Sequence, residues 1–242
     1  MNHNCGQAVT RMIEYDIQFD TLNGRLIVRG HFCPGSVPVN IPESDPDRFI
    51  CISYYLHIED IQKSISFLKC ISADKPEIIN EALFVAGLNC FMKCFKVSRA
   101  REKIPKEDFL GDNRGVENEF HFFESIRERH YMHDENSMLT PSAFLVIHPE
   151  SMPERLGPVS VVWNAVKIDY YEQSERLRYL ATLALEYAKD RFERYCKDII
   201  DRYKELPRET LLEFGSPNII PANISAVDQN RLQVITKEVR TE

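Results

Sequence analysis

The chain has 242 residues, of which 43% are hydrophobic and 28% charged, and its formal net charge is −7. This length and composition allow a substantial buried core and are typical of a globular protein. The acidic balance argues against broad, nonspecific nucleic-acid binding, which depends on many Lys and Arg side chains. It leaves room for a few cations focused in one cleft.

The sequence also carries signals about the compartment. No apolar run approaches the roughly 20 residues that span a bilayer, and the first residues lack the basic and apolar blocks of a secretory signal. The seven cysteines are odd in number and show no paired spacing, which favours reduced thiols. We therefore expect a cytoplasmic protein with no membrane partner.

The N-terminal part is predicted to form a β-hairpin and a connector. Apolar and polar residues alternate from Ile13 to Asp20, which is typical of a half-buried strand. Asn23-Gly24 then supplies a tight turn before a return strand over residues 25–32. Prolines at every fourth position from Pro34 to Pro46 indicate an extended connector. Residues 1–48 are therefore predicted to lie outside the main domain.

Helical periodicity begins at about Tyr54 and predicts a first helix to residue 71. Asp74-Lys75-Pro76-Glu77 predicts a helix start, with Asp74 as capping carboxylate and Pro76 in the first turn. The second helix is predicted to run to about Ala100. It is apolar on most sides, which suggests a central position in a bundle.

The second half is predicted to contain two more long helices. A polar loop over residues 103–115 precedes a helix from about Val116 to His133, and two short strands follow at 143–148 and 159–166. The last helix is predicted over residues 170–206, and residues 207–242 form a tail. The predicted fold is mainly α, with a four-helix bundle over residues 49–206, an N-terminal β-hairpin and a small two-stranded insertion before the last helix.

The third predicted helix carries the most informative segment. Two arginines and two histidines occur within seven residues, at Arg127, Arg129, His130 and His133. At about 100° per residue, both histidines fall inside the apolar arc of the helix, and the two arginines border it. Imidazole and guanidinium groups on the packing face of a helix either form hydrogen bonds within the core or point toward a ligand.

Five residues separate Arg127 from His133. Arg127 is followed directly by Glu128, Arg129 and His130, and Asp134 comes directly after His133. This resembles the HEPN superfamily, whose motif is an arginine, four to six residues and a histidine near the end of the third helix of an up-and-down bundle. The resemblance covers residues 49–206. It implies an up-and-down four-helix HEPN-like bundle. Many such proteins are metal-independent endoribonucleases, and others are noncatalytic modules.

The resemblance implies a site for cleaving RNA by attack of its own 2′-hydroxyl, without a cofactor or a metal. His133 would act as general acid or base, since imidazole titrates near neutral pH. Arg127 would stabilise the transition state through its phosphate-matching fork. Arg129, His130 and Asn136 would bind substrate.

The partners that the resemblance implies are RNA, a second copy of the chain and an antitoxin or regulatory protein. On a regular helix Arg127 and His133 lie about 120° apart with roughly 9 Å of rise, too far apart for one phosphate. In the family, two protomers bring their motifs into one cleft, so activity would require a homodimer. The setting would be toxin–antitoxin or phage-defence biology. Many active members have Asn, Asp or His after the arginine, whereas Glu128 here is able to pair with Arg127 or Arg129.

Several alternatives stay open on the residues alone. In one alternative, the chain is a noncatalytic HEPN-like module for dimerisation or for binding nucleotides or RNA. In the other, it is a stress protein without a nucleic-acid role. Arg127 would then pair with Glu124 one turn back, and the histidines would be satisfied at a helix end. His130, His133, Asp134 and Glu135 also offer metal ligands, but the His-Glu-x-x-His pattern is missing. Cys90 and Cys94 on the second helix are predicted to be core thiols.

Overall fold

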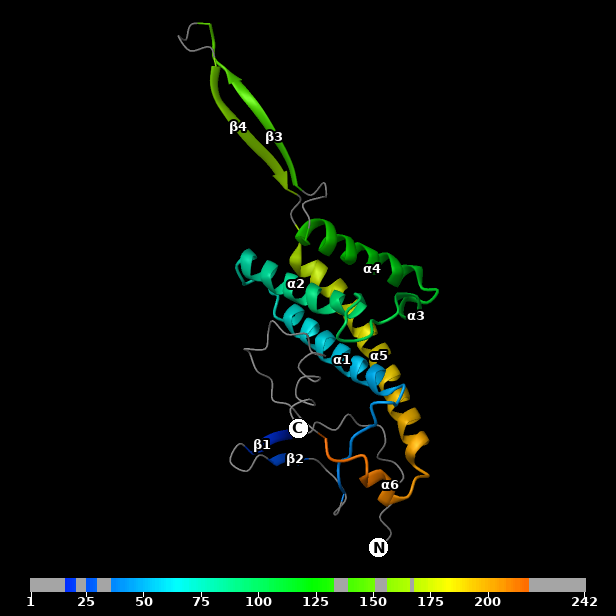
Figure 1. The fold of residues 1–242 in the computed structure, drawn as a ribbon. Helices are drawn as coiled ribbons and strands as arrows, with labels where there is room; N and C mark the ends of the chain where they lie inside the picture. Colours follow the sequence, from blue (N-terminus) through cyan, green and yellow to red (C-terminus); the bar gives the residue numbers. More distant parts are fainter. Residues whose placement is uncertain are drawn as a thin grey trace. The chain divides into compact units, whose positions relative to one another are not determined.

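The computed structural model describes residues 16–20, 25–29, 36–132, 139–150, 156–165 and 168–217. Within these residues the protein is mainly helical, with two separate two-stranded antiparallel sheets (Figure 1). The elements are β1 (Asp16–Asp20), β2 (Arg25–Arg29), α1 (Arg48–Lys69), α2 (Glu77–Met92), η2 (Lys93–Phe95), α3 (Lys106–Leu110), α4 (Arg114–Ser125), the π-helix η3 (Ile126–Met132), β3 (Leu139–Ile147), β4 (Leu156–Ala165), α5 (Tyr170–Tyr203) and α6 (Arg208–Leu212).

The chain divides into two compact units, one formed by residues 1–54, 98–102 and 190–242 and the other by residues 55–97 and 103–189. Helices α1 and α5 each contribute residues to both units. We call them unit 1 and unit 2. The predicted domain boundaries at residues 48 and 206 stay predictions.

In unit 1, the carboxylate of Asp45 links the start of α1 to the end of α5. Its Oδ1 accepts hydrogen bonds from the backbone N–H of Asp47 at 2.9 Å and of Arg48 at 3.1 Å, as a capping residue does. Its Oδ2 accepts from the Tyr203 hydroxyl at 2.8 Å and pairs with Arg202. Burial raises the pKa of Asp45, but these hydrogen bonds outweigh it and hold the pKa below its usual value.

Two further contacts in unit 1 join the same helices. The rings of Tyr54 and Tyr195 stack with centroids 5.7 Å apart. The Sγ atoms of Cys51 and Cys196 lie 3.6 Å apart. The hydrogen bond between these thiols, followed by burial, raises the pKa of Cys51, and the same bond lowers the pKa of Cys196. The packing of α1 on α5 here is therefore aromatic and thiol-rich.

In unit 2, an aromatic core joins α2, α3, α4 and the start of α5. Phe84 on α2 lies against Phe123 of α4 at 6.3 Å and against Tyr170 of α5 at 5.7 Å between ring centroids. Helix α1 approaches α2 closely at Gly87, whose carbonyl accepts a 2.7 Å hydrogen bond from the buried Ser64 hydroxyl. A Cβ added at Gly87 would lie 2.9 Å from Cγ of Leu68, so only glycine fits this crossing.

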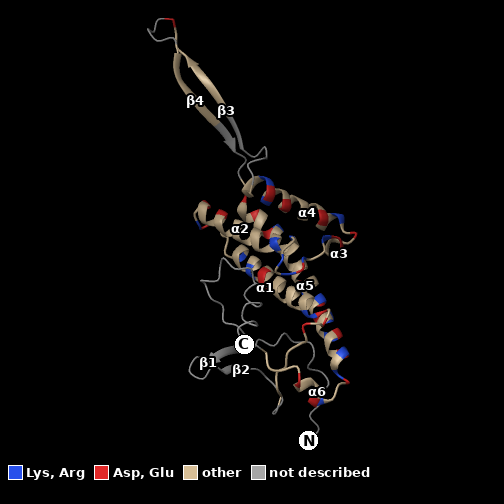
Figure 2. Cartoon of the chain, in the orientation of Figure 1, with Lys and Arg blue, Asp and Glu red and all other residues tan. Residues whose placement is uncertain are grey.

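Both predicted β-hairpins are present. Asp16 to Asp20 of β1 pairs antiparallel with β2, and the predicted Asn23-Gly24 turn lies outside the described residues. β3 and β4 also pair antiparallel, in the position predicted for the insertion before the last helix. Acidic and basic residues intermingle along α5 (Figure 2). The prediction of a mainly helical protein with small antiparallel additions is thus confirmed.

Some predicted boundaries are wrong. The second helix ends at Met92 and continues only as a 3-10 turn to Phe95, because Lys96 adopts an extended conformation and the carbonyl of Cys94 bonds to the N–H of Ile104. Asp74 does not cap α2. Pro76 occupies the N-cap position without a side-chain cap, and Asn80 bonds back to Ser72 instead.

Two short helices lie where a loop and a tail were predicted. Helix α3 forms within the predicted loop over 103–115, where Leu110 is buried. Helix α6 lies in the predicted tail, of which residues 218–242 are outside the described residues. Both follow a proline, Pro105 and Pro207, which is compatible with a helix start.

Within the described residues, one helical stretch, Glu77–Phe95, is long and apolar enough to span a membrane by length and composition alone. It was not expected from the sequence, in which no apolar run was judged long enough. Its residues Phe84, Leu88, Phe91 and Met92 are buried in the core of unit 2. The stretch thus also fits the core helix predicted from its apolar composition.

Candidate functional site

Three of the five predicted site residues lie on the π-helix η3. Arg127 is partly buried, Arg129 is exposed, and His130 is half-buried with its ring 4.8 Å from that of Tyr131. His133 and Asn136 lie outside the described residues. The joining of Arg127 and His133 in one site stays a prediction.

The motif segment is a π-helix, whereas the helical-wheel placement assumed a regular α-helix. A regular helix turns about 100° per residue, but η3 has i→i+5 hydrogen bonds, so each residue turns through a smaller angle. Ile126 is buried as expected, whereas His130 is not within the core. π-Helical turns are rare in proteins. Those that do occur are frequently found at functional sites. Here the ring of Tyr131 lies 6.5 Å from that of Phe84.

Arg127 is oriented by α2 and by its own neighbour. Its Nε donates a 3.0 Å hydrogen bond to Oδ1 of Asn89, and its Nη1 donates to Oε1 of Glu128. The expectation that Glu128 pairs with a flanking arginine is confirmed. The alternative pairing of Arg127 with Glu124 is not found. Arg127 retains 18% side-chain exposure, so its side chain is only partly buried in unit 2.

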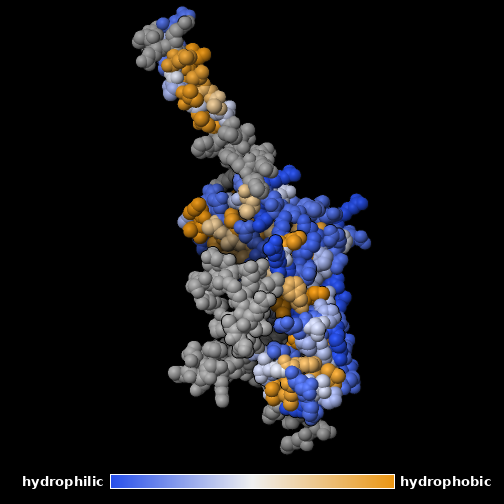
Figure 3. Space-filling view, in the orientation of Figure 1, coloured by the Kyte–Doolittle hydropathy of each residue, from blue (hydrophilic) through white to orange (hydrophobic). Residues whose placement is uncertain are grey.

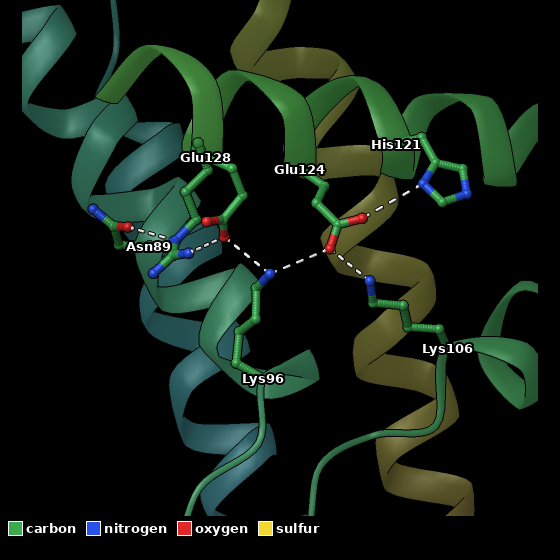
Figure 4. A network of polar contacts seen from close by, with 7 residues as sticks. Asn89, Lys96, Lys106, His121, Glu124 and Glu128 are labelled. Carbon is green, nitrogen blue, oxygen red and sulfur yellow. Dashed lines mark hydrogen bonds and ion pairs between the residues drawn. The ribbon is translucent and has the colours of Figure 1, made fainter. Parts of the chain in front are cut away.

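A network of charged side chains extends from Arg127 across this surface (Figure 4). Lys96 Nζ lies between Oε1 of Glu128 at 2.9 Å and Oε1 of Glu124 at 3.3 Å. Lys106 Nζ lies 2.5 Å from the same Glu124 oxygen. Nδ1 of His121 lies 3.5 Å from the other Glu124 oxygen. We call the five residues Arg127, Lys96, Lys106, Glu124 and Glu128 the Arg127 cluster.

The Arg127 cluster has a net positive charge, since three cations face two carboxylates. Lys96 and Lys106 keep 38% and 27% of their side chains exposed. A phosphate approaching this surface would meet partly desolvated cations whose positions are held by the carboxylates. The arrangement is therefore suited to contacting an anion.

The carboxylates of the cluster are held ionised. Burial raises the pKa of Glu124, but hydrogen bonds from Lys106 and Lys96 outweigh it and bring the pKa below its usual value. A hydrogen bond from Lys96 lowers the pKa of Glu128, against a smaller effect of burial, and Arg127 adds to the lowering. Both groups therefore remain charged to a lower pH than an ordinary glutamate does.

This arrangement predicts acid sensitivity. A carboxyl group with a lower pKa in the folded state contributes stability above its unfolded pKa, about 4.3 for Glu, and loses it as the pH falls through the folded value. We expect the urea midpoint of the wild-type chain to fall as the pH is lowered from about 5 to about 3. In the Glu124→Gln variant the midpoint should fall less over this range. Equal slopes for both proteins would contradict this role for Glu124.

The sequence analysis missed Asn89, Lys96 and Lys106. Asn89 is a polar residue within the apolar stretch from Ala82 to Met92 of α2, which is the signal that would have identified it. The two lysines come from segments predicted as the end of a helix and as a loop. They come near α4 only because α2 ends early and Lys106 begins α3.

The other sequence predictions have mixed outcomes. Cys94 is buried in the core as predicted, whereas Cys90 is partly exposed. In the part of the chain that the structure describes, no group of three or more His, Cys, Asp or Glu is placed to hold a metal ion. The alternative metal site at His130 and His133 includes residues outside that part, so it stays untested.

Comparison with known proteins adds no relative, since no family model, curated protein or solved structure matches the chain. The interpretation of the site therefore depends on its own geometry and on the motif.

Proposed function

We propose that the chain is a HEPN-type, metal-independent endoribonuclease that acts as a cytoplasmic homodimer. The observation that supports it is the placement of Arg127, the motif arginine, on a π-helical turn within a net positive, partly exposed cluster. Asn89 holds Nε of Arg127 without neutralising it, since an amide carries no charge. An arginine positioned in this way is suited to bind a phosphate.

In the proposed reaction the 2′-oxygen of RNA attacks the adjacent phosphorus and the bond from phosphorus to the 5′-oxygen breaks. An imidazole, assigned to His133, takes the proton of the 2′-hydroxyl, and an imidazolium protonates the leaving 5′-oxygen. Arg127 donates hydrogen bonds to the charge that develops on the phosphoryl oxygens. Arg129, His130 and Asn136 would orient the RNA. The products are a 2′,3′-cyclic phosphate and a 5′-hydroxyl.

A second candidate function is a noncatalytic HEPN-like module that dimerises or binds RNA or nucleotides. One observation favours it. Within a single chain, Arg127 is already paired with Glu128. At the position directly after the arginine, many active family members have a smaller or uncharged residue. A carboxylate in this position competes with a substrate phosphate for the same guanidinium. Such a resting state would also suit control by an antitoxin or another regulatory protein.

Replacement of Glu128 with Asn separates the two candidates. A hydrogen bond to a charged group contributes about 1.5 kcal/mol or more, so its removal is expected to raise kcat/KM for RNA cleavage about tenfold if the chain is a ribonuclease. A noncatalytic module would bind RNA more tightly after the same change but would not cleave it. Cleavage of a fluorogenic oligoribonucleotide and its binding by anisotropy measure both.

The matched control is Glu175→Asn, which removes a carboxylate that pairs with Arg178 on α5, away from the motif. This variant is expected to behave as wild type in both assays. If Glu128→Asn changed neither cleavage nor binding, both candidate functions at Arg127 would be contradicted.

A further inference from the structure

Over residues 143–147 and 156–161, one face of the β3–β4 hairpin is aliphatic. Cross-strand partners lie on the same face of a sheet, and so do residues two apart in one strand. The register pairs Ala143 with Val161 and Leu145 with Val159, and, beyond a register shift, Ile147 with Leu156. We call the set of these six residues the hairpin apolar face.

The hairpin apolar face is exposed. Leu145, Val159 and Val161 are 56%, 67% and 58% exposed, and Ile147 and Leu156 are 78% and 58% exposed. The hairpin surface in Figure 3 is accordingly dominated by hydrophobic residues. The opposite face is mixed, because Ser142 and Ser160 lie there beside their exposed partners Val162 and Phe144.

An exposed surface of this kind is unfavourable unless something covers it. The exposed parts of the hairpin apolar face add up to about 600 Å² of mainly apolar surface. This is the upper end of the area that a typical monomer leaves exposed in one patch. An isolated two-stranded hairpin is also marginally stable in water and needs packing on one face. The hairpin apolar face therefore has the properties of an interface.

The composition of the hairpin favours a second copy as the occupant. β3 and β4 contain no charged residue, so they offer nothing to attract anionic lipid headgroups or to match a charged partner. The exposed Glu150 in the loop after β3 opposes insertion of the tip into a bilayer. Interfaces between identical subunits are more apolar than those between different proteins.

The size of the surface is also sufficient. In a twofold dimer the same patch is contributed by both copies, so about 600 Å² from each copy would bury about 1,200 Å² in total, the lower end of the range for specific, stable interfaces. We propose that the hairpin apolar face packs face to face against its counterpart in a second copy of the chain. This interface goes beyond the proposed function and holds whether or not the chain cleaves RNA.

The test is the mass of the full-length protein in solution, measured by light scattering during size-exclusion chromatography. The wild type is expected to be a dimer at about 10 µM and above. The double variant Leu145→Lys/Val161→Lys places charges on the hairpin apolar face and is expected to be monomeric. The matched control Ser142→Lys/Ser160→Lys places the same charges on the opposite face and should remain dimeric.

Circular dichroism checks that the variants keep their helices. If the lysine variant of the apolar face loses helical signal, Ile147→Ser/Val159→Ser serves as a milder replacement, with an expected increase of at least about tenfold in the dimer dissociation constant. A monomeric wild type, or a dimer that survives both replacements, would overturn the proposal. Flotation of the wild type, but not of the face variants, with phosphatidylcholine–phosphatidylglycerol vesicles would overturn it in favour of a lipid surface.

Discussion

Replacement of Arg127 with Ala is expected to lower kcat/KM for RNA cleavage by about 100- to 1,000-fold, the usual effect of removing a donor that stabilises transition-state charge. Arg127 has the position for this role, because Asn89 orients its guanidinium and the lysines of the Arg127 cluster raise the local positive potential. The initial rate on a fluorogenic oligoribonucleotide measures the effect. Arg127→Lys should recover only part of the activity, since an ammonium lacks the planar fork.

The control for this experiment is Arg178→Ala. Arg178 also pairs with a nearby glutamate, Glu175, but it lies on α5 away from the motif. This variant is expected to cleave RNA at the wild-type rate. If Arg127→Ala cleaved RNA as well as wild type, while its urea midpoint showed it to be folded, the catalytic assignment of Arg127 would be wrong.

Replacement of Phe120 with Ala is expected to lower the free energy of unfolding by about 3–5 kcal/mol. Phe120 is fully buried, and its ring lies 4.8 Å from that of Phe95, 6.1 Å from that of Phe91 and 6.4 Å from that of Phe109. Truncation would leave a cavity between four helical segments of unit 2 and remove these ring contacts. Urea unfolding followed by circular dichroism measures the loss.

Phe122, two residues further along α4, provides the control. It is 38% exposed and contacts the guanidinium of Arg176 at 4.6 Å from its ring centroid. Its replacement with Ala is expected to cost about 1 kcal/mol, the scale of an exposed cation–π contact. Equal losses for the two variants would mean that the aromatic core is not centred on Phe120.

The helices were predictable where apolar residues follow a regular period. Ile58, Ile61 and Leu68 are spaced as a buried helical face and are buried in α1. The period of two in the N-terminal segment and in the insertion likewise indicated the strands that pair as β1–β2 and β3–β4. Boundaries failed where one local interaction decides them, such as the extended backbone of Lys96, because periodicity does not report such interactions.

The candidate site was predictable only in part. Arg127 and Glu128 are adjacent in the chain, so their pairing followed from the sequence. The bond from Arg127 to Asn89 joins residues 38 positions apart and depends on how α4 packs against α2. The π-helical turn was not predictable either, because apolar spacing over seven residues does not distinguish i→i+4 from i→i+5 hydrogen bonding. The regular wheel drawn for this segment therefore assumed the wrong helical period.

The most direct test of the account is incubation of the purified wild-type chain with a mixed RNA pool in EDTA. The proposed chemistry needs no metal ion, so we expect cleavage into fragments with 2′,3′-cyclic phosphate and 5′-hydroxyl ends, detected by end-specific ligation and mass spectrometry. The His133→Ala protein should give none. Intact RNA with the wild type, or the same fragments with His133→Ala, would contradict the ribonuclease assignment.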